Sequence, residues 1–137
     1  MNTVDNTIPR LIKVPINFSP SGSLGVIESK EPFPFRIKRI FYVTNAGANC
    51  IRGNHGHYEC HEFLICLNGI IEVHLKWKSK NETFKLNDPG YGLYVPNKTY
   101  ITLKYIKAES ILLALASEYY DKADYFYQPL GFNNNDE

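Results

Sequence analysis

The chain has 137 residues, of which 44% are apolar and 21% are charged, and its formal net charge is +1. This balance indicates a soluble globular domain, and it excludes a disordered chain, a basic nucleic-acid-binding protein and a protein held to anionic membranes by charge. The three cysteines have no CxxC spacing, and neither a signal peptide nor an apolar run long enough to span a bilayer is present, so we expect free thiols in the cytoplasm.

Short runs of β-branched and aromatic residues, separated by clusters of Gly, Pro, Asn and Asp, predict strands along most of the chain. The predicted strands are Ile37–Thr44, Glu62–Leu67, Ile70–Trp77, Gly92–Val95, Thr99–Tyr105 and Ser110–Ala116. Asn68-Gly69 predicts a hairpin and Lys80-Asn81 a turn, while Tyr119–Tyr125 is compatible with a turn or a short helix. Strands at this spacing are typical of an antiparallel sandwich or barrel. We therefore expect one all-β domain over residues 1–137, with a frayed tail at 133–137.

The stretch RGNHGHYECHEFLICLNG, from Arg52 to Gly69, contains three of the four histidines of the chain. If residues 54–58 are extended, His55 and His57 project to the same side, because alternate residues of a strand share a face. On the outer face of an edge strand they would be ordinary surface histidines. In a cavity they would need a ligand, a metal or a hydrogen-bond network.

The spacing of His55, His57, Glu62 and Gly69 fits the first cupin motif. The second motif supplies its glycine and proline in GYGLYVP, but Tyr100, Ile101 and Thr102 stand where its histidine belongs. Three candidate ligands remain, and three protein ligands can hold a catalytic zinc or iron. The missing histidine weakens the hypothesis of a metal enzyme but does not exclude it.

Four segments, FRIKRIFYV, RGNHGHYECHEFLICLNG, LNDPGYGLYVP and LALASEYYDKADY, together resemble the sugar 3,4-ketoisomerases that act on dTDP-4-keto-6-deoxyglucose. The resemblance runs from about Gly22 to about Tyr127. It implies a jelly-roll cupin fold, a homodimer and an isomerase that uses a histidine pair without metal or other cofactor. Such an enzyme moves the keto group from C4 to C3 through an enediol, in the biosynthesis of 3-amino-3,6-dideoxy sugars. Histidine suits this chemistry because its ordinary pKa of about 6.5 lets it take and give protons near neutrality.

The resemblance places the base that removes the carbon-bound proton on His55, with His57 as its partner. The candidate substrate-binding residues are two cations and two aromatic residues: Arg52, Arg39, Tyr94 and Tyr100. Each arginine either binds the diphosphate or polarises a substrate oxygen, and the alternative is a solvated surface arginine. The two tyrosines either line the cavity and stack on thymine or sugar or belong to the core of the barrel. His61 and His74 are interpreted as sheet-surface residues, and Cys60 and Cys66 as small apolar fillers.

Phe41 departs from the family pattern, because relatives carry a tyrosine at this position. The lost phenol removes one proton donor, so either the histidines suffice or Tyr42 or a water substitutes for it. The configuration of the product at C4, galacto or gluco, therefore stays open.

Three functional hypotheses follow. The first is the metal-independent ketoisomerase, with a dTDP-linked 4-keto-6-deoxy sugar as its ligand and a second copy of the chain as its partner. The others are a metal-dependent cupin enzyme that uses His55, His57 and Glu62, and a non-catalytic module that binds sugar nucleotides. Because exposed sheet edges need cover, we expect the apolar segment Ile8–Phe18 at the dimer interface.

Overall fold

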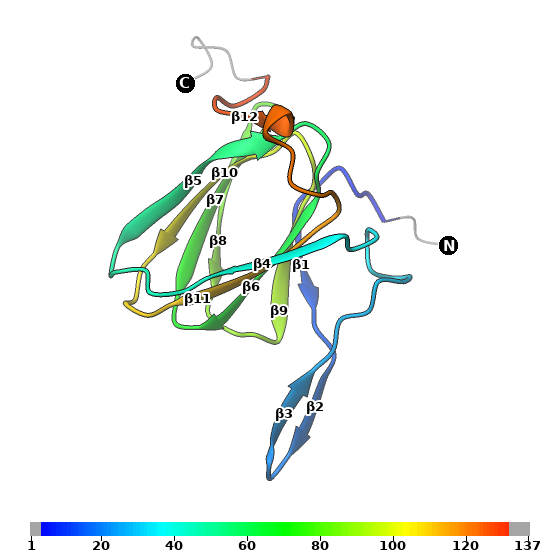
Figure 1. The fold of residues 1–137 in the computed structure, drawn as a ribbon, viewed down its shortest axis with the longest axis vertical. Helices are drawn as coiled ribbons and strands as arrows, with labels where there is room; N and C mark the ends of the chain where they lie inside the picture. The colour runs from blue at the N-terminus through cyan, green and yellow to red at the C-terminus, as the bar shows by residue number, and fades with distance from the viewer. Residues whose placement is uncertain (1–3, 132–137) are drawn as a thin grey trace.

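The computed structural model describes residues 4–131, which form two facing five-stranded antiparallel sheets and a separate hairpin (Figure 1). The first sheet has the order β1 (Arg10–Lys13), β9 (Tyr91–Val95), β6 (Glu62–Asn68), β11 (Ile111–Ala116) and β4 (Arg39–Val43). The second has the order β12 (Tyr125–Phe126), β5 (Cys50–His57), β10 (Tyr100–Tyr105), β7 (Ile71–Trp77) and β8 (Lys80–Leu86). The remaining elements are the β2 (Ile16–Ser19) and β3 (Gly22–Gly25) hairpin and a 3-10 turn, η1 (Lys122–Asp124). This arrangement confirms the predicted all-β jelly roll.

The space between the two sheets is filled by the alternate residues of their strands. On β7 these are Ile71, Val73 and Leu75, all fully buried, and on β10 they are Ile101, Leu103 and Tyr105. The alternation that predicted these strands thus also defines which of their side chains face the interior. No helix among residues 4–131 is long and apolar enough to cross a membrane.

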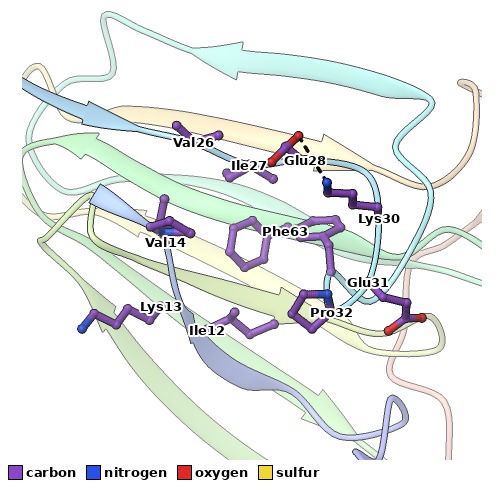
Figure 2. A pocket seen from close by; sticks show the side chains of 12 residues that line it. Ile12, Lys13, Val14, Val26, Ile27, Glu28, Lys30, Glu31, Pro32 and Phe63 are labelled. Carbon is purple, nitrogen blue, oxygen red and sulfur yellow. Dashed lines mark ion pairs between the residues drawn. The ribbon is translucent and has the colours of Figure 1, made fainter. Parts of the chain in front are cut away.

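A second apolar layer lies on the outer face of the first sheet. Its buried members are Val14, Phe63, Ile65, Tyr94 and Leu115. The loop after β3 covers this layer and leaves a hollow of about 220 Å³ above Phe63, with charged side chains such as Lys13 and Glu31 among its lining residues (Figure 2). The histidines do not line this hollow.

All six predicted strands are present within two residues of their predicted bounds, and the short helix expected in Tyr119–Tyr125 is the turn η1. The hairpin predicted at Asn68-Gly69 is wrong, because β6 and β7 belong to different sheets and the chain crosses between them there. Gly69 has φ +92. The next residue, Ile70, forms two hydrogen bonds with the hydroxyl of Ser110: its N–H group donates to the hydroxyl oxygen, and its carbonyl accepts from the hydroxyl.

The turn predicted at Lys80-Asn81 is also misplaced. These residues begin β8, and the two-residue turn before them is Lys78-Ser79, with Lys78 at φ 54. Strands β1, β2, β3, β8 and β12 were not predicted, since they are short or largely exposed and carry few apolar residues on their inner faces. For β5, an extended conformation was considered only for residues 54–58, at its end. The tail expected to fray, residues 133–137, lies outside the described residues.

Candidate active site

The local geometry of β5 brings the side chains of Arg52, His55 and His57 to the inner face of the second sheet. Regular alternation would put Arg52 and His55 on opposite faces, because they are three residues apart. Gly53 at φ +90 and Asn54 at φ 57 form a bulge here, and the pairing with β10 shifts between Ile101 and Thr102. As a result Arg52 and His55 both line the same cavity. Bulges commonly re-aim side chains in this way next to active sites.

Gly56, between the two histidines, is required by the strand that closes the site. Strand β12 pairs with the end of β5, with Tyr125 opposite His57 and Phe126 opposite Gly56 (Figure 1). A Cβ atom on Gly56 would collide with the ring of Phe126. The HGH sequence thus lets the ring of Phe126, on the neighbouring strand β12, pack against Gly56 while both imidazoles point inward.

His57 is buried, at 4% exposure, between two carboxyl groups. Its Nδ1 atom lies 3.2 Å from Oδ2 of Asp124, and its Nε2 atom lies 3.7 Å from Oε1 of Glu62. Burial lowers the pKa of His57 to about 4, against the opposing effect of the Asp124 charge. His57 is therefore a neutral imidazole at neutral pH, with a carboxylate in place to accept a hydrogen bond from Nδ1 and stabilise a transient imidazolium.

His55 faces a cavity of about 90 Å³ between the two sheets, near the edges of β4 and β5. The centre of its ring lies 5.3 Å from the centre of the His57 ring, and the two ring planes meet at an angle of 89°. Burial lowers the pKa of His55, so this imidazole is also neutral and available as a proton acceptor at neutral pH. Most other lining residues are apolar, Ile101 directly opposite His55 among them.

Glu62 and Arg39 complete the inner end of the site. Burial raises the pKa of Glu62 to about 7, although the positive charge of Arg39 acts in the opposite direction. Arg39 projects inward from β4, and its guanidinium lies 5.3 Å from the centre of the Phe41 ring. Its buried Nε has no hydrogen-bond partner among residues 4–131. Such an unpaired buried donor is costly unless a ligand or water accepts from it.

Tyr125 is the phenol closest to the histidines. Its ring centre lies 4.3 Å from that of His57 and 5.0 Å from that of His55. The hypothesis that Tyr42 replaces the phenol missing at Phe41 is wrong, because Tyr42 is 70% exposed and alternates to the outer face of β4. A second phenol, the fully buried Tyr105, lines the cavity, and its hydroxyl has no hydrogen-bond partner within the described part of the chain.

Two of the predicted substrate-binding residues lie elsewhere. Tyr94 is fully buried in the outer apolar layer, where its hydroxyl bonds to Nδ1 of His61 at 2.7 Å and to the carbonyl of Asn6 at 2.8 Å. Tyr100 pairs with Gly56 and alternates with Ile101, so it lies on the outer face of β10. The expectation that these tyrosines line the cavity is wrong. Tyr94 follows the inward-facing Leu93 and Tyr100 precedes the inward-facing Ile101, so both side chains point to the opposite face of their strands.

The other sequence assignments agree with the structure in part. Cys60 and Cys66 are buried, and all three cysteines are free. His74 bonds to Thr83 on the outer face of β7, as expected for a sheet-surface residue, whereas His61 is half-buried beneath Phe35 and Tyr94.

The residues proposed for a cupin metal do not form a metal-ligand cluster. Within residues 4–131 one group of at least three potential ligands converges, and it consists of His57, Cys60 and Asp124. His55 and Glu62 are not part of it, and Ile101 occupies the inward position opposite His55. The donor set required by the metal-dependent alternative is thus not assembled here.

Comparison with known proteins identifies the family of this chain. The family described as "FdtA: WxcM-like, C-terminal" matches residues 6–137. The chain belongs to this FdtA/WxcM-like family. It is 35% identical over 107 residues to the TDP-4-oxo-6-deoxy-α-D-glucose 3,4-oxoisomerase of Aneurinibacillus thermoaerophilus, which covers 78% of this chain and 77% of the relative.

Solved structures of relatives share the fold over most of their length. The sugar 3,4-ketoisomerase QdtA of Thermoanaerobacterium thermosaccharolyticum in complex with TDP is 38% identical, with a TM-score of 0.83 over 88% of both chains. A histidine-to-asparagine variant of QdtA in complex with TDP-4-keto-6-deoxyglucose is 36% identical, with a TM-score of 0.84 over 92% of this chain and 90% of that one.

Two residues of this FdtA/WxcM-like site, Asp124 and Tyr125, were not predicted as site residues. Both belong to the segment LASEYYDKADY, which contributed to the family resemblance but offered no periodicity that would bring it near β5. The side-chain carboxylate of Asp124 accepts hydrogen bonds from the backbone N–H groups of Glu59 and Cys60, at 2.7 and 3.2 Å. These long-range contacts hold the C-terminal segment against the histidine strand.

The raised pKa of Glu62 predicts a pH dependence of stability in this member of the family. The carboxyl group of Glu62 binds its proton more tightly in the folded than in the unfolded protein. The free energy of unfolding that this adds is complete below pH 4.5 and is lost as the pH rises to about 7. Between about pH 5 and pH 8, the unfolding free energy of the wild type should fall by up to about 3 kcal/mol relative to that of Glu62→Gln. Urea unfolding of both proteins across this range measures the difference. Parallel pH profiles would mean that Glu62 is ionised in the folded protein.

Proposed function

We propose that this protein is an isomerase that moves the keto group of TDP-4-keto-6-deoxyglucose from C4 to C3, without a metal or other cofactor. The observation that carries the proposal is the pair of inward-facing neutral imidazoles, one at the cavity and one between two carboxyl groups, in a member of this family. The named relatives are 3,4-ketoisomerases of TDP-linked sugars. The product would be the substrate of an aminotransferase that forms 3-amino-3,6-dideoxy sugars, and we expect the reaction in the cytoplasm.

In the proposed reaction His55 removes the proton from C3, which the neighbouring carbonyl acidifies. The C–H electron pair forms a double bond between C3 and C4, and the carbonyl π pair moves to the C4 oxygen. That oxygen takes up a proton, the C3 hydroxyl loses one, and a proton is returned to C4 as the C3 carbonyl forms. The number of protons is unchanged, so groups that both accept and donate near neutral pH are sufficient.

The two histidines have different surroundings, which supports a division of roles. His55 faces the cavity and can reach a carbon atom there. His57 lies between Asp124 and Glu62, a position that suits the transfer of protons between the two sugar oxygens. Arg39, with its unpaired Nε, is proposed to polarise a substrate oxygen, and Arg52, at the exposed side of the cavity, to bind the diphosphate.

The direct test is incubation of the protein with TDP-4-keto-6-deoxyglucose, followed by proton NMR. We expect the 3-keto sugar to appear, and in D₂O we expect deuterium at the reprotonated carbon. The configuration at C4 is read from the same spectra. Binding of the substrate without conversion would contradict the proposal and favour the non-catalytic binding module.

Activity is expected to persist after removal of metal. The isoleucine opposite His55 supplies no ligand, and His55, His57 and Glu62 do not converge as a ligand set. Treatment with a chelator should therefore leave the turnover number unchanged within error, as measured by the same NMR assay. Stoichiometric zinc or iron in the purified protein, together with loss of turnover on chelation and recovery on metal addition, would favour the metal-dependent alternative.

The protein is expected to be a homodimer. The β2–β3 hairpin extends away from the sheets, and two of its apolar side chains, Phe18 and Leu24, are 81% and 62% exposed (Figure 1). Beside it, an open hollow of about 860 Å³ is lined by apolar side chains on the outer face of the first sheet, Ile40 and Leu113 among them. Exposed apolar side chains that lie next to one another in this way suit an interface.

Light scattering should give twice the chain mass of 15.7 kDa. Phe18→Asp places a charge on the hairpin and should shift the equilibrium towards the monomer. A monomer mass for the wild type that does not change with concentration would contradict the dimer.

A further inference from the structure

A group of potential metal ligands lies beside the histidine pair and differs from the cupin set. His57 ends β5, Cys60 lies in the following turn, and Asp124 ends η1, yet their ligand atoms all lie within 4.8 Å of one another. His57 and Cys60 are buried, and the side chain of Asp124 is 10% exposed. The three residues thus bring one nitrogen, one sulfur and one oxygen donor to a single point with limited access to water.

This donor set suits zinc. Zinc takes imidazole, thiolate and carboxylate ligands in tetrahedral geometry, and three protein ligands leave the fourth position for water. Ligand atoms about 2.0 Å from a tetrahedral zinc are about 3.3 Å apart. The separation of 3.2 Å between Nδ1 of His57 and Oδ2 of Asp124 already has this length.

The backbone holds the three ligands in place without a metal. The side-chain carboxylate of Asp124 accepts the N–H group of Cys60, and the N–H group of Tyr58 donates to the backbone carbonyl of Asp124 at 2.8 Å. The turn that carries Cys60 is therefore tied directly to another ligand. Such pre-organisation lowers the ordering cost of binding.

We propose that His57, Cys60 and Asp124 form a zinc-binding site whose occupation inhibits the enzyme. Zinc binds Nδ1 of His57, a carboxylate oxygen of Asp124 and the sulfur of Cys60. As the bonds to zinc form, the thiol proton passes to solvent, and the proton on Nδ1 of the neutral imidazole is replaced by one on Nε2, so the ring stays neutral. The metal then occupies the nitrogen that Asp124 otherwise orients, so His57 no longer exchanges protons with the substrate. The inhibitory part of this proposal rests on the proposed function, whereas the binding part does not.

Binding is tested with Co²⁺ as a spectroscopic substitute for zinc. Reduced, full-length protein freed of metal by chelator and dialysis should bind one equivalent of Co²⁺ and develop a thiolate-to-cobalt charge-transfer band. The band should be absent in Cys60→Ser and Cys60→Ala, and it should be lost or strongly reduced in Asp124→Asn. Cys66→Ser is the matched buried control and Cys50→Ser the exposed one, and both should retain the band. Absence of the band in the wild type, or its persistence in both Cys60 variants, would overturn the site.

Inhibition is tested separately. Zinc should reduce turnover by the wild type and a chelator should restore it, whereas Cys60→Ser should need about tenfold more zinc or higher for the same effect, with normal turnover in its absence. Equal zinc sensitivity of the wild type and Cys60→Ser would overturn the inhibitory role. A protein that shows the cobalt band but converts no keto sugar would retain the metal site while contradicting the proposed function.

Discussion

Replacement of His55 by asparagine is expected to lower the turnover number for TDP-4-keto-6-deoxyglucose by at least about a hundredfold. Asparagine keeps much of the size and hydrogen-bonding reach of imidazole, but it cannot take a proton near neutral pH. Affinity for TDP should change little, because the diphosphate contact proposed for Arg52 is separate from the reacting carbons. The expected loss therefore falls on the chemical step.

The measurement combines turnover, followed by NMR, with TDP affinity from calorimetry. His74→Asn is the matched control, because this histidine lies on the outer face of β7, where its ring bonds to the hydroxyl of Thr83. The control should keep full turnover. If His55→Asn stays within a few-fold of the wild type, the base is not His55 and the assignment moves to His57.

The pH profile provides a second check on His55. Burial lowers its pKa below the ordinary value of 6.5, and a base is active in its deprotonated form. The value of kcat/KM should therefore stay constant from neutral pH down through 6.5 and fall only below that point. A decline that begins above pH 6.5 would indicate a different titrating group.

The sequence predicted the parts of this fold that follow from local alternation. Residues such as Val73 and Leu75 recur at every second position, and they lie on the inner face of a strand at the predicted place. The projection of His55 and His57 to one side follows from the same period. The hairpin at Asn68-Gly69 was wrong because a favourable turn sequence does not reveal whether the next strand pairs with the previous one or crosses to the other sheet.

The chemistry of the site depends on features that alternation does not reveal. Arg52 faces the cavity only because of the bulge at Gly53-Asn54, whose effect on strand direction appears once the pairing with β10 is known. Tyr94 and Tyr100 are aromatic residues on predicted strands, but register places each of them one position away from an inward-facing residue. Burial, register and contacts between distant segments therefore decided which predicted residues belong to the site.

Asp124 is a site residue that the sequence analysis did not predict. Its proposed role, to position His57, can be tested. Its carboxylate lies 3.2 Å from Nδ1 of His57 and favours the tautomer with a proton on that nitrogen, which leaves Nε2 free to accept a proton. In an Asp124→Asn variant the side-chain amide is neutral and can present an N–H group to His57 instead. We expect the turnover number to fall by about ten- to a hundredfold, with little change in KM, because Asp124 does not line the cavity.

The same substitution should alter the pH profile in a defined direction. The negative charge of Asp124 partly offsets the effect of burial on His57, whose pKa is lowered to about 4, so removal of this charge should lower that pKa further. Any acid limb of the turnover profile that reports His57 should therefore move to lower pH in the variant. Loss of stability alone would reduce the amount of folded enzyme without moving this limb.

Asp121→Ala separates positioning from general disruption of the C-terminal segment. Asp121 caps η1 by accepting a hydrogen bond from the N–H group of Ala123, at 3.0 Å, and this bond stays within the turn. Its replacement should cost about 1 kcal/mol of stability and leave the turnover of folded protein unchanged. If Asp121→Ala lowers turnover as much as Asp124→Asn does, then order in this turn accounts for the effect, and the carboxylate next to His57 has no specific role in catalysis.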